Sequence, residues 1–301
     1  MYDACQTSAM EDAPLPLGKE GAMTIKYDNL VLKKLNYNSY LKIPDLLELQ
    51  QPISDPVHHD EMFFIIIHQA AELWFKNIMH EVEKVVDGFR EPMISRALKG
   101  FKRVTAITDL LVKQINLLST LTPVEFAGFR DNLNPASGFQ SFQFRKMEYL
   151  FGVRDAFFLK FFESMPERVA ELEEIRNQPT VYDEFWKCLK ETAKVDLPDS
   201  FLQRDCTKNH ELNEDLVQVI LNIYENPGEN YHFCLLFEAM LDFDEKFSLF
   251  RSTHMLMVER TIGHKKGTGG SAGYKFLQSR AHLKFFPELW DVRNHIGKVG
   301  Y

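Results

Sequence analysis

The sequence predicts an all-α protein, a multi-helix domain with long central helices. Two segments, residues 58–88 and 233–262, carry apolar residues three and four positions apart over many turns, which is typical of long amphipathic helices. Residues 122–125 read TPVE, a capping box with proline at the first helical position. No segment alternates apolar and polar residues between hairpin turns, as half-buried strands do.

Helices are expected between breaks made by proline, glycine and polar residues. In the first half of the chain we expect two short elements in 36–52 divided by Pro44, a long helix 58–88 after Pro56, a helix 92–121 and a short helix from the capping box to Asn134-Pro135. Ser137-Gly138 is expected to open the next helix, which is followed by shorter helices at 157–178 and 181–194 and an irregular stretch at 195–209. The last part is expected to contain a helix 213–226 before the turn Pro227-Gly228, the long helix 233–262, a helix 276–283 and an irregular tail from Phe286.

The domain organisation follows from composition along the chain. Residues 1–24 are rich in proline, glycine and acidic residues, and we expect them to form a disordered leader. Residues 25–301 are long enough to bury one large core and are expected to form a single all-α domain. Within it, residues 155–210 are a candidate helical insertion.

Composition bounds the class of protein. The chain is 45% hydrophobic and 26% charged with a net charge of −8, which is typical of a globular protein and unlike a nucleic-acid-binding surface. The four cysteines are scattered, which favours a reducing compartment over a disulfide framework. The longest apolar run, residues 62–67, is too short to cross a bilayer, and the N-terminus lacks the pattern of a secretion signal. We therefore expect a cytoplasmic protein that binds neither membranes nor nucleic acid.

His254 lies among apolar residues of the second long helix, just before a glycine-rich loop. On spacing alone, such a histidine is either a hydrogen-bonded core residue or an axial ligand of a haem iron. Five of the 15 glycines fall within residues 263–273, which indicates backbone that only glycine tolerates or that approaches a ligand closely. The order Lys266-Gly267-Thr268 excludes a phosphate-binding loop of the Walker type.

His68 lies on the apolar stripe of the first long helix, with Phe64 one turn before it and Glu72 one turn after. A core histidine is again the alternative to a functional one. Nearby histidines and acids, from His58 to Glu72, also fit a di-metal carboxylate bundle, but that site needs a second Glu-x-x-His helix, which the sequence does not provide.

Five separated motifs, from Tyr37 to Arg293, resemble the tryptophan 2,3-dioxygenase family. They read, in order, NYNSYLKI, HHDEMFFIIIHQAAELWFK, LTPVEFAGFRDNLNPASGFQSFQFR, MVERTIGHKKGTGG and FFPELWDVR. The resemblance implies an all-α homotetramer, a dimer of dimers, with one haem b per subunit. It also implies a reaction that adds both atoms of O2 across the indole C2–C3 bond of L-tryptophan to give N-formylkynurenine, the first step of tryptophan catabolism.

The resemblance carries roles to individual residues. His254 matches the axial ligand of the haem iron, and a single histidine ligand leaves a coordination position open. His68 matches the distal histidine that accepts a hydrogen bond from the indole N–H, and whether it also removes the proton stays open. Arg130 matches the clamp on the substrate carboxylate, for which a guanidinium fork is suited. Its alternative is a surface arginine paired with Asp131.

Further residues match the substrate pocket. Thr268 corresponds to the loop threonine that contacts the amino-acid end of the substrate, and Ser137 to a serine near the haem that is also a good helix N-cap. Phe64 and Phe126 match aromatic positions that flank the indole. Tyr37 and Tyr40 match an N-terminal segment that completes the pocket of a neighbouring subunit.

Two other readings remain. Departures from the family pattern, such as His264, leave room for a related haem enzyme of secondary metabolism that oxygenates a modified tryptophan or a related aromatic amino acid. A haem-based sensor without catalysis is the alternative from another class, although it has no need for a carboxylate clamp at Arg130.

Overall fold

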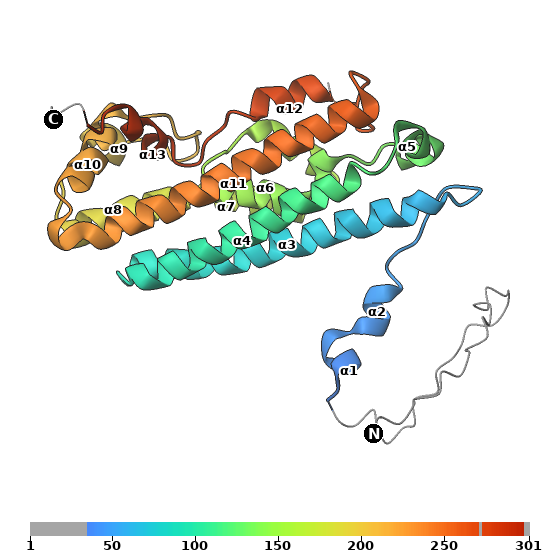
Figure 1. Cartoon of the computed structure of the whole chain (residues 1–301), viewed down its shortest axis with the longest axis horizontal. Coiled ribbons are helices and arrows are strands. Elements are labelled where there is room, and N and C mark those ends of the chain that lie inside the picture. The colour runs from blue at the N-terminus through green and yellow to red at the C-terminus, as the bar shows by residue number, and fades with distance from the viewer. Residues whose placement is uncertain (1–34, 271–272, 298–301) are drawn as a thin grey trace, which may run out of the picture. The chain divides into compact units, whose positions relative to one another are not determined.

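The computed structural model describes residues 35–270 and 273–297 (Figure 1). All regular secondary structure in these residues is helical, which confirms the all-α prediction. Contacts divide the chain into two units, residues 1–49 and 50–301, which are described separately.

The predicted domain organisation stays a prediction. The leader expected at residues 1–24 lies outside the described residues. Within the candidate insertion, residues 155–210, Leu172 of the helix at 166–176 packs with Tyr149 and Phe162 in a small separate cluster. The helix at 181–193 contributes to the main core instead.

The first unit contains two short helices, α1 (Tyr37–Leu41) and α2 (Ile43–Leu47). Asn36 and Ser39 form a capping box that starts α1, and Pro44 sits in the first turn of α2. Neither helix has a buried residue, so this segment has no core of its own.

Three long helices form the centre of the second unit: α3 (His59–Arg90), α4 (Ile94–Leu118) and α11 (Tyr231–Ile262). They run side by side, with α4 packed against both of the others (Figure 1). The helices predicted at 58–88 and 233–262 are therefore confirmed, with ends shifted by one or two residues.

Shorter helices surround these three. They are α5 (Pro123–Arg130), η1 (Asp131–Leu133), η2 (Gly138–Gln140), α6 (Phe142–Leu150), η3 (Ala156–Phe162), α7 (Pro166–Arg176), α8 (Val181–Ala193), α9 (Asp199–Leu202), α10 (Glu214–Glu225), η4 (Gly228–Asn230), α12 (Tyr274–Arg280), α13 (Pro287–Asp291) and η5 (Val292–Asn294). The capping box predicted for α5 is present, since the Glu125 N–H donates to Thr122 Oγ1 at 3.3 Å and the Thr122 N–H donates to the Glu125 carboxylate at 2.7 Å.

Four local predictions are wrong in detail. The helix expected after Ser137 is split into η2 and α6, because Ser141 is the N-cap of α6 and starts a separate helix there. The helix expected at 157–178 is split at Pro166, which starts α7. The stretches expected to be irregular, 195–209 and the tail, contain α9, and α13 with η5.

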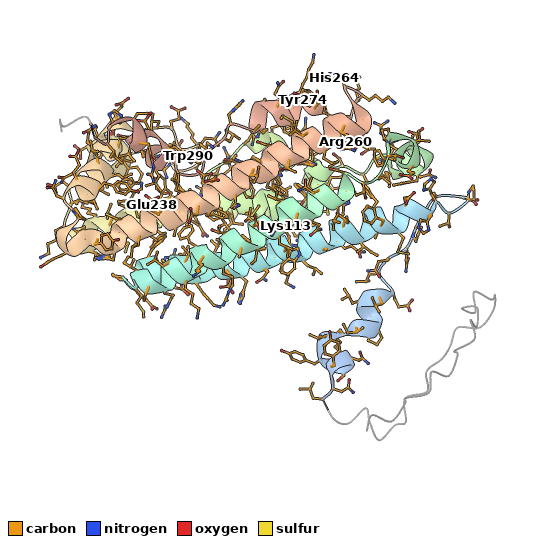
Figure 2. All side chains as sticks on the ribbon, in the orientation of Figure 1. Lys113, Glu238, Arg260, His264, Tyr274 and Trp290 are labelled. Carbon is orange, nitrogen blue, oxygen red and sulfur yellow. The ribbon has the colours of Figure 1, made fainter. Side chains whose placement is uncertain are left out.

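A buried carboxylate fixes the chain that follows α12 onto α11. Asp244 Oδ2 accepts hydrogen bonds from the N–H groups of Phe285 and Phe286, at 3.0 and 3.1 Å, and from Trp290 Nε1 at 3.0 Å. Trp290 is labelled in Figure 2. These contacts give the tail an ordered position that sequence periodicity does not indicate. Among the described residues, no helix combines the length and apolar character needed to span a membrane.

Candidate functional site

A cavity of about 370 Å³ lies within the second unit, between the three long helices and the shorter segments α5, η2, α6 and α12. Most of the side chains around it are apolar and a few polar ones converge on it, as is usual for cofactor and small-molecule pockets. Seven of the nine candidate site residues line this cavity: Phe64, His68, Phe126, Arg130, Ser137, His254 and Thr268.

His254 reaches the cavity from α11. Protein atoms surround the imidazole, and this burial, with a smaller contribution from His68, lowers the pKa of His254 to about 4. The ring is therefore neutral at physiological pH, which is the form that ligates a metal. Within the described chain neither ring nitrogen has a hydrogen-bond partner, so the hydrogen-bonded core histidine considered from the sequence is not what the structure contains. A neutral, unpartnered imidazole on the wall of an apolar cavity fits an axial haem ligand.

His68 reaches the same cavity from α3 and lines it. Its Nδ1 lies 2.7 Å from the Phe64 carbonyl oxygen. Because a carbonyl only accepts, Nδ1 must carry the proton, and Nε2 of the neutral ring is left as an acceptor. Desolvation lowers the pKa of His68, while the Phe64 hydrogen bond and the charge of Glu72 oppose this shift. His68 therefore offers an acceptor nitrogen to a ligand.

α4 forms part of the cavity wall and holds the segment that carries His68. It supplies Leu111, Ile115 and Leu118 to the cavity wall. Gln114 on the same helix donates a hydrogen bond to the carbonyl of Ile67, the residue before His68. This bond fixes α3 against α4 at the level of the cavity.

Aromatic rings form one wall. Phe64 and Phe126 are stacked with ring centroids 5.6 Å apart, and Phe129 packs edge-on against both. Such a wall fits the flat face of an aromatic ligand.

Arg130 ends α5 at the edge of the cavity. Its Nη2 donates to the main-chain carbonyl of Lys266 in the glycine-rich loop. Its Nε is buried and has no hydrogen-bond partner in the part of the chain that the structure describes. Over the same residues it forms no ion pair with Asp131, so the surface pair considered from the sequence is wrong. The guanidinium retains donors for an anionic ligand.

The glycine-rich loop packs on the segment before α6. Thr268 Oγ1 donates to the Ala136 carbonyl at 2.6 Å, and Gly269 lies so close to Ser137 that an added Cβ would overlap its side chain. Ser137 caps η2, as expected, accepting from the Phe139 N–H at 3.3 Å. These contacts explain why the loop needs glycine at position 269.

The ends of the loop are also joined. The rings of His264 and Tyr274 meet edge-to-face at 5.2 Å (Figure 2). Gly273 has φ +55°, where a side chain is strained, and an added Cβ would meet the Lys265 carbonyl at 2.7 Å. Backbone geometry thus accounts for part of the glycine content that the sequence displays.

Tyr37 and Tyr40 belong to the first unit. Both lie on α1, and their side chains are largely exposed, at 73% and 70%. Their expected role in a neighbouring subunit stays a prediction.

The sequence analysis missed a charged group on the cavity wall, made of Arg145, Glu148, Arg251 and Arg280. One signal was available: Arg251 is three residues before His254 and so shares its helix face. The described residues contain no group of three or more His, Cys, Asp and Glu side chains arranged to hold a metal ion, so the di-metal alternative gains no support.

Gly269→Ala should loosen the loop. The added methyl overlaps Ser137, and overpacking of this kind costs about 1–3 kcal/mol. Local opening of the loop should therefore be roughly 5-fold to 150-fold more populated, and trypsin should cleave after Lys265 and Lys266 correspondingly faster. Gly138→Ala is the matched control, since an added Cβ there meets nothing within 4 Å. Equal cleavage rates in the two variants would contradict the close contact.

Comparison with known proteins agrees with the geometry. The family model described as tryptophan 2,3-dioxygenase matches residues 28–213 and 157–296. A tryptophan 2,3-dioxygenase of Rhodococcus jostii (strain RHA1) is 45% identical over 266 residues, covering 88% of this chain and 93% of the relative. One from Arthrobacter sp. (strain FB24) is 44% identical over 265 residues, with the same coverage.

A more distant relative extends the comparison. The tryptophan 2,3-dioxygenase of Myxococcus xanthus (strain DK1622) is 41% identical over 263 residues, covering 87% of this chain and 90% of the relative. Matches of this identity over nearly the full length of several relatives are decisive, and this chain belongs to the tryptophan 2,3-dioxygenase family.

Proposed function

We propose that this chain is a haem b-dependent dioxygenase that cleaves the C2–C3 bond of the indole of L-tryptophan with O2, giving N-formylkynurenine. The observation that carries the proposal is that one apolar cavity brings together a neutral unpartnered His254, an acceptor nitrogen on His68 and free donors on Arg130. Membership of the family supports the reaction. In this role the protein performs the first step of tryptophan catabolism.

His254 is the residue that would hold the haem. Its imidazole is neutral at physiological pH, so a ring nitrogen could bind the iron without first losing a proton. The bound haem iron would supply the activation of O2, and the protein supplies binding and orientation. Apolar side chains from α3, α4, α6 and α11 exclude water from this part of the cavity.

His68 orients the indole. Since Nδ1 is occupied by the Phe64 carbonyl, Nε2 accepts the hydrogen bond of the indole N–H. The stacked pair Phe64 and Phe126 holds the ring face, so the bond to be cleaved is presented in one orientation. C2 and C3 each gain one oxygen atom as the bond between them breaks.

Arg130 and the loop hold the amino-acid end of the substrate. The guanidinium pairs with the carboxylate, and Thr268 lies on the same loop as Lys266, whose carbonyl holds that guanidinium. Ser137 positions that segment through its close contact with Gly269 and lies beside the haem-binding part of the cavity.

The proposal includes a homotetramer in the cytoplasm. Exposed apolar residues recur at seven-residue intervals on each long helix, which favours helix-to-helix association: Ile66 and Leu73, Leu110 and Leu117, Leu249 and Leu256. The described part of the first unit, residues 35–49, has exposed tyrosines at 37 and 40 and no buried residue, and is suited to docking on a neighbouring subunit. Light scattering of the purified protein tests this, and a monomeric mass would contradict it.

The test of function is an anaerobic optical titration of the reduced protein with L-tryptophan, followed by admission of O2 and mass analysis of the product. We expect a Soret band that shifts with tryptophan and a product that has gained two oxygen atoms. If product forms only from a substituted indole, the chain is instead a related haem enzyme of secondary metabolism. Tryptophan binding without O2 consumption would favour the sensor, and no Soret band would refute the proposal.

His254→Ala accompanies this experiment and should abolish the Soret band. His232→Ala, on the same helix but remote from the cavity residues, is the control and should retain it. Full haem content in the His254 variant would contradict the ligand assignment.

His68→Ala should abolish the discrimination between tryptophan and 1-methyltryptophan, which lacks the indole N–H. Leaving a buried polar group without its partner costs about 1–3 kcal/mol, so the native protein should favour tryptophan roughly 5-fold to 150-fold in kcat/KM. His80→Ala, at an exposed position of the same helix, should keep this preference. Equal preference in the native protein and the His68 variant would show that Nε2 does not receive the indole.

Arg130→Ala should weaken tryptophan binding while haem stays bound. Truncating one partner of such a pair costs on the order of 2–5 kcal/mol, measured as the shift in Kd from the Soret titration. Tryptamine, which has no carboxylate, serves as the control ligand and should bind both proteins equally. An equal loss of tryptophan and tryptamine binding would point to a packing role instead.

A further inference from the structure

Glu72 is a charged side chain on the cavity wall that the mechanism above does not use. It lies on α3 four residues after His68, so the two side chains share one face of the helix. Glu72 is half-buried, and the acids and histidines near it form no metal site among the described residues. Its place beside His68 indicates a role in the site instead.

Two donors from the start of α6 hold the carboxylate of Glu72 in place. Its Oε1 accepts from the hydroxyl of Ser141, the N-cap residue of α6. Its Oε2 accepts from Gln143 Nε2 at 3.3 Å, and the same amide donates to the main-chain carbonyl of Glu72 at 2.9 Å. Protein donors thus occupy both carboxylate oxygens, and the side chain is a fixed part of the cavity wall.

These partners leave the negative charge of Glu72 without a counter-charge. A hydroxyl and an amide are both uncharged, and no basic side chain forms an ion pair with Glu72 in the part of the chain that the structure describes. Beside an apolar cavity, solvent and salt screen a half-buried charge less than they screen a charge at the surface. The charge therefore acts on polar groups that face the same cavity.

His68 is the group on which this charge acts. Burial lowers the pKa of His68, and the negative charge of Glu72 opposes this shift because it favours the protonated ring. Other charged or titratable side chains line the cavity from the surrounding helices: Arg130 on α5, Arg145 and Glu148 on α6, Arg251 and His254 on α11, and Arg280 on α12. Among all these side chains, only Glu72 adds a charge effect to the pKa of His68.

The same charge strengthens the acceptor nitrogen of His68. A nitrogen with a greater affinity for a proton is also a better hydrogen-bond acceptor, and Nε2 is that nitrogen because Nδ1 donates to the Phe64 carbonyl at 2.7 Å. We propose that Glu72 is a positioning residue for His68, whose fixed negative charge, one helical turn away, strengthens Nε2 as the acceptor for the indole N–H. This inference rests on the proposed function, because it requires that His68 receives the indole.

The test measures the preference for tryptophan over 1-methyltryptophan, as a ratio of kcat/KM values, in the haem-loaded full-length protein at several pH values. Because the ratio compares two substrates, pH effects on steps that they share cancel. Protonation of Nε2 removes the acceptor, so acidification should abolish the preference, with a midpoint that reports the pKa of His68.

Glu72→Gln keeps the size of the side chain and one acceptor oxygen but removes the charge. Its preference for tryptophan at neutral pH should be lower than that of the native protein by roughly 2-fold to 10-fold, the range of one ordinary hydrogen bond. The midpoint should move to lower pH, because the charge that favoured the protonated ring is gone. A purely structural role of Glu72 would not move the midpoint in this direction.

Two further variants separate the charge from the tether to α6. Glu72→Asp keeps the charge on a shorter side chain, and Gln143→Ala keeps the charge but removes one of its two donors. Both should keep most of the preference and a midpoint near the native one. Glu83→Gln, at an exposed position of α3, is the matched control for the loss of a carboxylate and should behave like the native protein.

The outcomes are separable. An undiminished preference in folded Glu72→Gln, or a reduced preference with an unchanged midpoint, would overturn this inference and leave the proposed function standing. Equal loss of preference in Glu72→Asp and Gln143→Ala would assign the contacts a structural role and also overturn it, even where circular dichroism shows that Glu72→Gln does not fold. If the native protein turns over both substrates equally, the role of His68 is wrong and this inference falls with it. Failure of the native protein to form product from tryptophan would refute the proposed function itself.

Discussion

α4 packs along α3 on one side and along α11 on the other, and the cavity exists because of that packing. Leu111, Ile115 and Leu118 line the space between the two outer helices, so the histidines of α3 and α11 face a largely apolar volume. Desolvation there lowers the pKa of both His68 and His254, because a charged imidazole is poorly solvated in such surroundings. Two neutral histidines in one cavity are the chemical result of helix packing.

Polar groups enter this volume only where the backbone or a buried carboxylate holds them. Arg130 is fixed by the Lys266 carbonyl and Thr268 by the Ala136 carbonyl. Glu148 holds the arginines at 145, 251 and 280. Each keeps some hydrogen-bonding capacity unused, which would be unfavourable in an ordinary core. The cavity thus combines an apolar interior with a few fixed donors, which is the usual composition of cofactor and small-molecule pockets.

Much of the fold could be predicted because it depends on local signals. The apolar periodicity of residues 58–88 and 233–262 extends over many turns, and the capping box at Thr122 acts within four residues. Predictions failed where tertiary contacts override local preference. The tail after Phe286 has weak helical periodicity, yet α13 forms there. Asp244 accepts hydrogen bonds from the two residues before this helix, Phe285 and Phe286, and from Trp290 within it.

The sequence by itself determined the helical class, the positions of the long helices and, through motifs similar to one family, the residues to examine. It could not decide whether His254 is hydrogen bonded, which nitrogen of His68 is free, or whether Arg130 pairs with Asp131. Those answers depend on atoms from other helices, such as the Phe64 and Lys266 carbonyls. The same holds for the charged group around Glu148, since Arg145, Arg251 and Arg280 lie far apart in the chain and meet only when α6, α11 and α12 pack together.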